Sequence, residues 1–167
     1  MRCWVAMRWT AEQAYERLAP AVRGYFRGRG ARDPNDLTGD VFVSVTRGLA
    51  SFHGDADALR RWVFTIAHHR MVDEFRRSQH DRHVWMAEVP EATHADVTVD
   101  TPFDDDLARA MAMLSDDQRE VVVLRFVADL AVKDVARIVG KRQGAVKMLQ
   151  ARGLERLHEL LQAEGGA

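Results

Sequence analysis

The sequence predicts an all-α protein made of two small helical domains joined by an acidic linker. Apolar residues recur at spacings of three and four over most of the chain, which is the period of one helix face, and no segment has a competing strand pattern. Residues 80–106 are the exception, because the period disappears, two prolines occur, and eight acidic residues face one basic residue. The expected domains are residues 1–79 and 107–167, with 80–106 as a flexible linker.

Charge is unevenly distributed, although the net charge of the 167 residues is only −1. Residues 1–79 hold 13 basic and 9 acidic residues, and residues 107–167 hold 10 and 8. The acidic linker thus separates two mildly basic domains, a pattern that the total charge conceals.

The compartment is expected to be the cytoplasm. Cys3 is the single cysteine, so no internal disulfide can form, and this usage is typical of a reducing compartment. No apolar run approaches the ~20 residues of a membrane span, and the first ten residues lack a secretory apolar region. Membrane insertion is therefore not expected.

Capping residues mark the first two helices. Thr10 is a suitable N-cap for a helix that runs to Arg29. Asp33 followed by Pro34 combines an N-cap with a residue favoured at the first helical position, and this second helix is expected to run to Phe52. We expect about four helices in the N-terminal domain and four in the C-terminal domain.

The second helix carries an aromatic residue between carboxylates. Leu37 and Val41 belong to its apolar stripe, whereas Asp36, Asp40 and Phe42 lie partly outside it. An exposed aromatic side chain in this setting indicates a surface for a protein partner. A second contact with the core explains the same pattern, and periodicity alone leaves both interpretations open.

A third helix follows the loop His53-Gly54-Asp55 and covers residues 56–78. It interleaves aromatic and basic residues, which suits single-stranded nucleic acid because rings stack on bases and cations follow phosphates. The alternative is a buried amphipathic helix with a solvated basic face, and Trp62 fits either role. The basic and imidazole side chains are Arg60, Arg61, His68, His69, Arg70, Arg76 and Arg77.

Residues 130–161 have the pattern of a helix-turn-helix. Apolar residues at i, i+3, i+4 and i+7 end at Gly140, where a left-handed residue would close the first helix. The second helix presents amide and basic side chains, which can read base edges in a major groove. An ordinary helical hairpin with a solvated basic face is the alternative. The candidate DNA-contacting residues are Arg142, Gln143, Lys147 and Gln150.

Enzyme signatures are absent from the sequence, and no cofactor is expected. It contains no glycine-rich phosphate loop and no G-x-S-x-G nucleophile motif. Four histidines, His68, His69, His80 and His83, suggest a metal site only weakly, because cysteine or acidic ligands do not recur at zinc spacing. No catalytic residue and no metal ligand is assigned.

These segments together resemble the extracytoplasmic-function sigma factors, the compact two-domain specificity subunits of bacterial RNA polymerase. Residues 36–52, DLTGDVFVSVTRGLASF, resemble the region 2 helix that docks on the polymerase clamp. Residues 52–77, FHGDADALRRWVFTIAHHRMVDEFRR, resemble the segment that melts and reads the minus-10 element. Residues 114–157 resemble region 4, whose helix-turn-helix reads the minus-35 element. The resemblance covers nearly the whole chain in the order of the family.

The resemblance implies three sets of site residues. Polymerase docking falls on Asp36, Leu37, Asp40, Val41 and Phe42. Contact with the minus-10 strand is implied for the loop Phe52, His53, Gly54 and Asp55, which holds a flipped base in a pocket in this family. The same contact is implied for Trp62, His68, His69, Arg70, Arg76 and Arg77. The minus-35 element falls on Arg142, Gln143, Lys147, Gln150 and Arg152. The implied partners are core RNA polymerase and promoter DNA, and an anti-sigma factor is a further partner that the resemblance admits.

The chain departs from the family pattern at several of these positions. Gly39 replaces a frequent glutamine, and His69 stands where asparagine is usual. Ala131 and Arg142 replace two serine N-caps of the helix-turn-helix, although Asp129 could cap in place of Ala131. Each lost cap costs about 1 kcal/mol of stability.

The linker admits a regulatory hypothesis, and two rival functions remain. A flexible acidic linker would let the two domains of the free protein pack together, hide both DNA-binding faces, and separate on the polymerase. The rivals are a stand-alone helix-turn-helix regulator of duplex DNA and a protein-interaction module that sequesters another factor. The aromatic and basic third helix favours the sigma factor, because ordinary regulators rarely need a helix for melting DNA.

Overall fold

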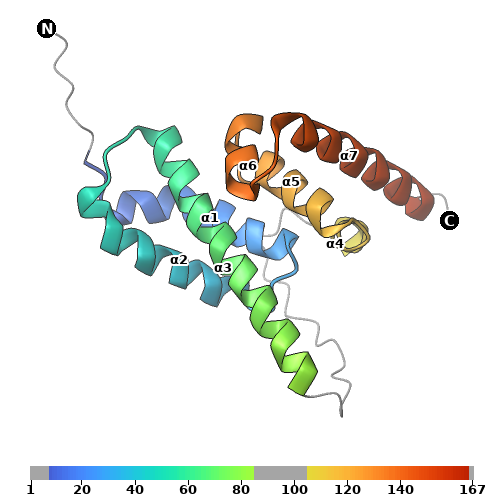
Figure 1. Cartoon of the computed structure of the whole chain (residues 1–167), viewed down its shortest axis with the longest axis horizontal. Helices are drawn as coiled ribbons and strands as arrows, with labels where there is room; N and C mark the ends of the chain where they lie inside the picture. The colour runs from blue at the N-terminus through green and yellow to red at the C-terminus, as the bar shows by residue number, and fades with distance from the viewer. Residues whose placement is uncertain (1–7, 85–104, 166–167) are drawn as a thin grey trace, which may run out of the picture.

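Seven α-helices and one 3₁₀ turn form two packed groups in the part of the chain that the structure describes (Figure 1). The structure is a computed structural model that describes residues 8–84 and 105–165, and side chains within residues 8–79 and 105–163. The first group is α1 (Ala11–Gly28), α2 (Pro34–Gly48), η1 (Leu49–Ser51) and α3 (Ala56–Val84). The second group is α4 (Asp105–Ala112), α5 (Asp116–Phe126), α6 (Val132–Val139) and α7 (Gln143–Gly165). The all-α prediction with two small helical domains is confirmed.

Local capping chemistry sets three helix starts where the sequence places them. The Thr10 hydroxyl accepts from the Gln13 amide, and the Gln13 side chain accepts from the Thr10 amide, which completes a capping box. The Asp33 carboxylate accepts from the backbone N–H three residues on, ahead of α2. Ser115 and Gln118 form a second capping box before α5. These caps need only residues within one helical turn, so the sequence alone predicts them.

The turn of the helix-turn-helix also follows the prediction. Gly140 adopts a left-handed conformation with φ of 65° and ends α6. Ala131 occupies the N-cap of α6 and forms no side-chain hydrogen bond there, so the expected loss of a cap is confirmed. Asp129 does not replace it, and its own backbone has a positive φ of 52°.

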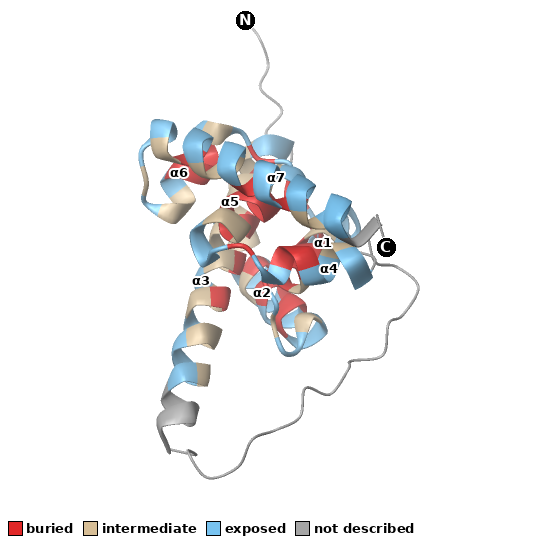
Figure 2. Ribbon diagram, turned by 90° about the vertical axis from the view of Figure 1, so that its right-hand side faces the viewer, coloured by how far each residue is buried: buried red, intermediate tan, exposed pale blue. Residues whose placement is uncertain are grey.

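The N-terminal core lies where α1, α2 and α3 meet (Figure 2). Its largest fully buried side chains include Tyr25 and Phe26 of α1, Val41 of α2, and Phe64 and Met71 of α3. The Tyr25 ring packs edge-on against Phe64, with ring centroids 6.0 Å apart. Aromatic pairs of this geometry favour one arrangement of the helices and so fix α1 on α3.

The C-terminal core depends on a close approach of α5 to α7. Val121 and Val123 of α5 are fully buried, as is Val146 of α7. A Cβ atom at Gly153 would lie 2.9 Å from a methyl carbon of Val122, so glycine is required for this contact. Leu154 and Leu161, two apolar residues later on α7, have exposed side chains.

α3 continues to Val84, beyond residue 79, where the predicted N-terminal domain ends. α4 likewise begins at Asp105, inside the segment that the sequence assigns to the linker. Acidic and polar residues at a helix terminus do not by themselves end a helix. The composition of residues 80–106 therefore does not show where α3 ends and α4 begins. Residues 85–104, which hold most of the predicted linker, lie outside the described residues.

Replacing Gly39 with alanine is expected to stabilise the protein by about 0.5–1 kcal/mol, because glycine inside a helix loses more backbone entropy on folding. Nothing lies within 4 Å of a Cβ atom built at this position of α2, so no clash opposes the gain. Gly48→Ala is the matched control, since its Cβ would lie 2.7 Å from the Trp62 ring and should destabilise. Denaturant unfolding of both variants measures the difference, and a Gly39→Ala variant less stable than wild type would contradict the expectation.

Candidate nucleic-acid interface

The predicted docking residues on α2 divide into a buried set and an exposed set. Leu37 and Val41 are buried, and Phe42 is only 7% exposed. The Phe42 ring packs edge-on against Tyr15 of α1, with ring centroids 4.9 Å apart. These three side chains are therefore part of the domain core, and their part in polymerase docking stays a prediction. Asp36 and Asp40 remain exposed.

An apolar residue that the sequence reasoning missed completes the exposed face of α2. Val43 is 50% exposed and follows Asp36 and Asp40 at helical spacing, so the three side chains lie on one stripe. The pattern could have revealed it, because Val43 falls outside the stripe of Leu37 and Val41. We call Asp36, Asp40 and Val43 the α2 face.

The loop between η1 and α3 is held by contacts on both sides. The Phe52 ring stacks on Trp62 at a centroid distance of 5.0 Å and an interplanar angle of 12°. The Asp55 carboxylate accepts a hydrogen bond of 2.8 Å from the Ala58 amide and so caps α3. His53 is left exposed at the tip of the loop. The loop therefore presents an imidazole beside an aromatic pair.

The predicted minus-10 residues of α3 form one principal stripe. Trp62, His69 and Arg76 recur every seven residues, which is close to two helical turns, and so they share a face of α3. Trp62 is half-buried, while His69 and Arg76 are exposed. Arg77 is exposed next to Arg76 on the turns of α3 that project from the rest of the molecule (Figure 1). An indole ring followed by an imidazole and arginine cations suits an unpaired nucleic-acid strand, because rings stack on bases and cations pair with phosphates.

Two residues of the same predicted set are engaged elsewhere. His68 lies about 100° around α3 from His69. It donates from Nδ1 to the Glu120 carboxylate of α5 at 3.0 Å. Arg70 donates to the Ser44 hydroxyl of α2 at 3.0 Å. In this arrangement His68 faces the C-terminal domain, and its place beside a DNA strand stays a prediction.

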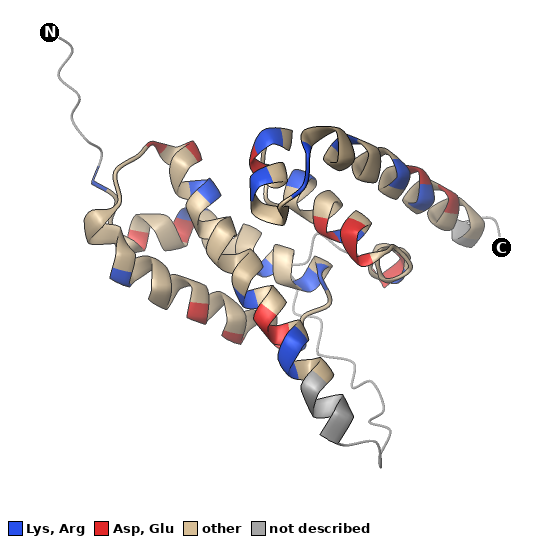
Figure 3. Cartoon of the chain, in the orientation of Figure 1, with Lys and Arg blue, Asp and Glu red and all other residues tan. Residues whose placement is uncertain are grey.

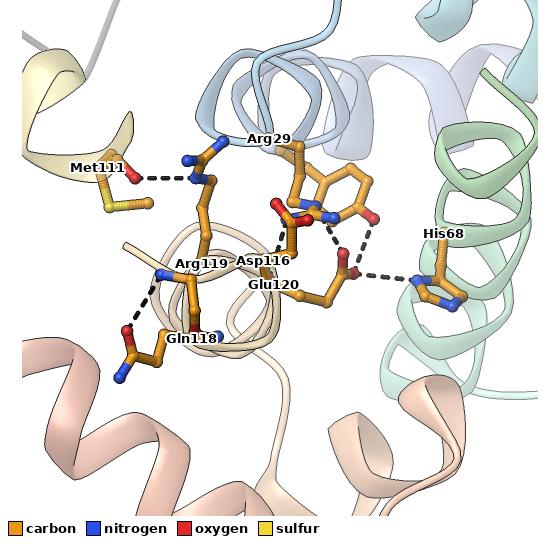
Figure 4. Close-up of polar contacts among 9 residues, drawn as sticks. Arg29, His68, Met111, Asp116, Gln118, Arg119 and Glu120 are labelled. Atoms are coloured by element: carbon orange, nitrogen blue, oxygen red, sulfur yellow. Dashed lines mark hydrogen bonds and ion pairs between the residues drawn. The ribbon is translucent and has the colours of Figure 1, made fainter. Parts of the chain in front are cut away.

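A buried polar cluster joins the two domains (Figure 4). Arg29 forms an ion pair of 2.6 Å with Glu120, and both residues are only 6% exposed. The Tyr25 hydroxyl donates to the same carboxylate at 2.8 Å, and His68 donates from the other side. We call these four residues the Glu120 cluster. A buried carboxylate needs such partners, because an unpaired charge in the interior is costly.

Further contacts extend this interface along α3. Arg60 donates to the backbone carbonyl of Ala128 at 3.0 Å, and Arg61 lies 3.7 Å from the Asp134 carboxylate of α6. The sequence reasoning missed Arg29, Glu120 and Asp134 as interface residues. The available signal was Glu120 itself, because an acidic residue before the apolar run VVVL must be paired if the helix is buried.

Arg119 closes the turn between α4 and α5 beside the Glu120 cluster (Figure 4). Its guanidinium donates to the backbone carbonyls of Met111 at 2.8 Å and Ala112 at 2.6 Å, at the end of α4, where the last carbonyls have no i+4 partner within the helix. Burial lowers the pKa of Arg119, and the nearby Arg29 charge lowers it further. The side chain thus anchors α4 against α5.

The Tyr25 phenol predicts a loss of stability at high pH. Burial raises its pKa well above 10.0, and the adjacent Glu120 carboxylate raises the pKa further. The unfolded chain therefore loses this proton first, and the free energy of unfolding falls as pH rises above 10.0, by up to about 1.4 kcal/mol per pH unit. Denaturant titrations on either side of that pH should show a shallower fall for Tyr25→Phe. Tyr15→Phe, at an exposed tyrosine, should keep the wild-type slope, and equal slopes in both variants would contradict the assignment.

The helix-turn-helix presents most of its predicted DNA residues to solvent. Arg142, Gln143 and Lys147 are exposed at the start of α7. Gln150 is half-buried, and its side-chain oxygen accepts from Arg125 at 2.9 Å. Arg152 lies about 180° around the helix from Gln143, since the two are nine residues apart. Arg152 and Gln143 therefore cannot both contact base edges in one major groove. A phosphate contact by Arg152 is compatible with this placement.

Basic residues outside the predicted set surround this surface. Figure 3 shows Lys and Arg over α6 and over the turn into α7. Lys133 and Arg137 of α6 are exposed, and Lys141 pairs with Asp117 at 2.9 Å. The first helix of a helix-turn-helix crosses the DNA backbone, so cations at Lys133 and Arg137 are suited to phosphates. The sequence reasoning considered only the second helix and missed them.

The described residues add two observations about other classes of site. Among the side chains within residues 8–79 and 105–163, no three His, Cys, Asp or Glu residues gather in a way that could hold a metal ion. His80 and His83 lie outside that range. None of the described helices is long and apolar enough to cross a membrane.

Two sigma factor families match this chain over its two domains. Residues 14–81 match the family described as Sigma-70 region 2, and residues 110–159 match Sigma-70, region 4. The first match contains the α2 face, the loop and the stripe on α3. The second contains the helix-turn-helix and Glu120.

Named relatives are sigma factors of the same class. The chain is 30% identical to the ECF RNA polymerase sigma factor BldN of Streptomyces coelicolor over 142 residues, 82% of this chain and 54% of BldN. It is 30% identical to the ECF RNA polymerase sigma factor SigM of Mycobacterium tuberculosis over 133 residues, 80% of this chain and 66% of SigM. The chain thus spans about half to two thirds of the length of these relatives.

Solved structures support the fold. The sigma factor RpoE, solved in complex with the anti-sigma factor NepR from Bartonella quintana, has a TM-score of 0.76 and 24% identity, covering 90% of this chain and 96% of RpoE. CnrH, solved in complex with the cytosolic domain of CnrY, has a TM-score of 0.64 and 23% identity, covering 92% of this chain and 88% of CnrH. With both regions matched in order, this chain belongs to the extracytoplasmic-function family of RNA polymerase sigma factors.

Proposed function

We propose that this protein is a non-catalytic specificity subunit that binds bacterial core RNA polymerase in the cytoplasm, recognises the minus-35 and minus-10 promoter elements, and melts the DNA. The observation that carries the proposal is the presence of three separate surfaces on one chain. The exposed α2 face is suited to a protein groove, the stripe Trp62, His69 and Arg76 is suited to an unpaired strand, and the start of α7 is suited to a major groove.

Each surface has a distinct part in this proposal. Asp36, Asp40 and Val43 dock on the polymerase, with the apolar side chain giving affinity and the two carboxylates beside it giving orientation. Arg142, Gln143 and Lys147 read the duplex. The loop at His53 and the stripe on α3 hold the melted strand, which compensates in part for the few kcal/mol that unstacking a base costs.

We further propose that the packed form of the chain is a resting state. His68, Arg60 and Arg61 of the melting helix contact the C-terminal domain, so this side of α3 is not available to other partners while the domains are packed. A ligand that binds only the separated domains, such as polymerase with promoter DNA, would shift the equilibrium towards them. Under this hypothesis the two domains separate at the Glu120 cluster when the chain binds polymerase.

An anti-sigma factor is the proposed regulatory partner. RpoE and CnrH were each solved with a partner, NepR for RpoE and the cytosolic domain of CnrY for CnrH. A protein that binds both domains of this chain in their packed form would hold it away from polymerase.

Transcription-start mapping tests the proposed function. Core polymerase would be incubated with genomic DNA of the host bacterium with and without the chain, and the 5′ ends of the transcripts sequenced. New start sites preceded by shared minus-35 and minus-10 sequences are expected only when the chain is present. Duplex DNA binding without new start sites would instead support a stand-alone helix-turn-helix regulator.

A further inference from the structure

A cavity of about 410 Å³ opens beside the loop that precedes α3. Its size falls within the range of ordinary ligand sites, roughly 300–1,000 Å³. Part of its wall comes from the segment that precedes α1, outside residues 14–81 that match Sigma-70 region 2. The lining residues are Arg8, Trp9, Thr46, Leu49, Ala50, Phe52 and His53, all in the N-terminal domain.

Trp9 connects this wall to the loop. Its indole Nε1 donates a hydrogen bond of 3.0 Å to the backbone carbonyl of Gly54, 45 residues away in sequence. The ring is 9% exposed, and the Arg17 guanidinium of α1 lies over it at 5.4 Å from the centroid. One side chain therefore ties the middle of the loop to the first helix.

The loop connects the Trp9 contact to Trp62, the aromatic residue of the stripe on α3. A Cβ atom at Gly54 would lie 2.9 Å from the Phe52 ring and 2.7 Å from Ala58, so the loop backbone is tightly placed between them. Phe52 in turn stacks on Trp62. A shift of Gly54 would therefore move Phe52 against Trp62, because close-packed contacts transmit small displacements.

We propose that Trp9 is a positioning residue of the minus-10 reading site and that Arg8 is a contact residue for the same strand. This inference rests on the proposed function. Trp9 holds the carbonyl of Gly54 so that Phe52 and His53 form one wall of the cavity. Arg8 adds a cation to the lining of the same cavity, where it pairs with the phosphate of a nucleotide whose base enters the cavity.

The chemistry of the lining favours an unstacked nucleotide over an apolar ligand. Leu49, Ala50 and Phe52 supply apolar surface for the face of a base, while Arg8 and His53 supply polar groups for its phosphate or edge. His53 Nδ1 lies 2.9 Å from the Ser51 carbonyl, which can only accept, so this nitrogen donates and Nε2 is directed elsewhere. The site thus combines a ring face with two polar groups.

The test measures base preference along the minus-10 strand. Holoenzyme assembled from core polymerase and the full chain would bind single-stranded oligonucleotides from a mapped promoter, with each of the four bases at each position. Trp9→Phe keeps a ring and loses the N–H donor. It should lower discrimination by about two- to tenfold at one or two adjacent positions, the effect of one hydrogen bond, with core affinity unchanged within about twofold.

Arg8 has a different expected signature. Arg8→Ala should weaken binding of the strand for all bases alike and lower the salt dependence of binding by about one phosphate contact, and Arg8→Lys should restore most of both. Arg32→Ala, at an exposed arginine before α2, is the matched control and should change neither quantity.

Two results would overturn the inference. Trp9→Phe holoenzyme with wild-type base preference at every position would show that the Gly54 contact does not position the site. A loss spread evenly over all positions, together with weaker core binding, would show that Trp9 only stabilises the domain. Wild-type chain that fails to bind core polymerase would instead refute the proposed function itself, and that measurement comes first.

Discussion

Replacing Glu120 with alanine is expected to separate the two domains of the free chain. The substitution leaves the Arg29 guanidinium buried without its carboxylate and removes the acceptor of Tyr25 and His68. Breaking a buried ion pair from one side costs about 3–5 kcal/mol. Separation of the domains lets water reach Arg29 and avoids most of that cost, so the variant should open while each domain stays helical.

Small-angle X-ray scattering and circular dichroism measure the two parts of this expectation. Wild type should scatter as one compact particle, and Glu120→Ala should give a larger radius of gyration with nearly unchanged helix content. Glu155→Ala, at an exposed acidic residue of α7, is the matched control and should match wild type. A Glu120→Ala chain as compact and as stable as wild type would contradict the role of the cluster.

Placing a lysine on the α2 face is expected to abolish tight binding to core polymerase. Asp40→Lys and Val43→Lys each replace an exposed side chain with a cation without touching the domain core. Hot-spot residues, which cluster near the centre of an interface, contribute 2 kcal/mol or more, so we expect each variant to lose at least about 30-fold in affinity. Thermal unfolding should remain close to that of wild type.

The choice of variant matters for this experiment. Phe42→Ala removes a core side chain that is 7% exposed, and losses of this type destabilise by about 3–5 kcal/mol. Weaker polymerase binding by that variant would therefore report unfolding as readily as docking. Glu155→Lys serves as the control, and unchanged core affinity in both α2 variants would exclude α2 as the docking helix.

The sequence predicts those features that depend on neighbours within about one helical turn. Thr10 and Asp33 cap helices as expected, and Gly140 takes the left-handed turn, because each needs only local backbone geometry. The stripe of Trp62 and His69 likewise follows from helical periodicity. Fold class and the order of the surfaces were predictable for this reason.

Features that depend on contacts between distant segments were not predictable. Arg29 and Glu120 are about 90 residues apart, and nothing in their local patterns states that they pair. Phe42 lies outside the main stripe of α2 and is nevertheless buried, because α1 supplies Tyr15 as a second neighbour. His68 and His69 are adjacent in sequence, yet only tertiary packing directs His68 to the other domain.

Co-elution of the purified chain with bacterial core RNA polymerase in size-exclusion chromatography is the most direct test of the central claim. Wild type, freed of any bound partner, should co-elute in a one-to-one complex, and the Asp40→Lys variant should elute separately. A partner-free, folded wild-type chain that elutes apart from core polymerase would contradict its assignment as a working sigma factor.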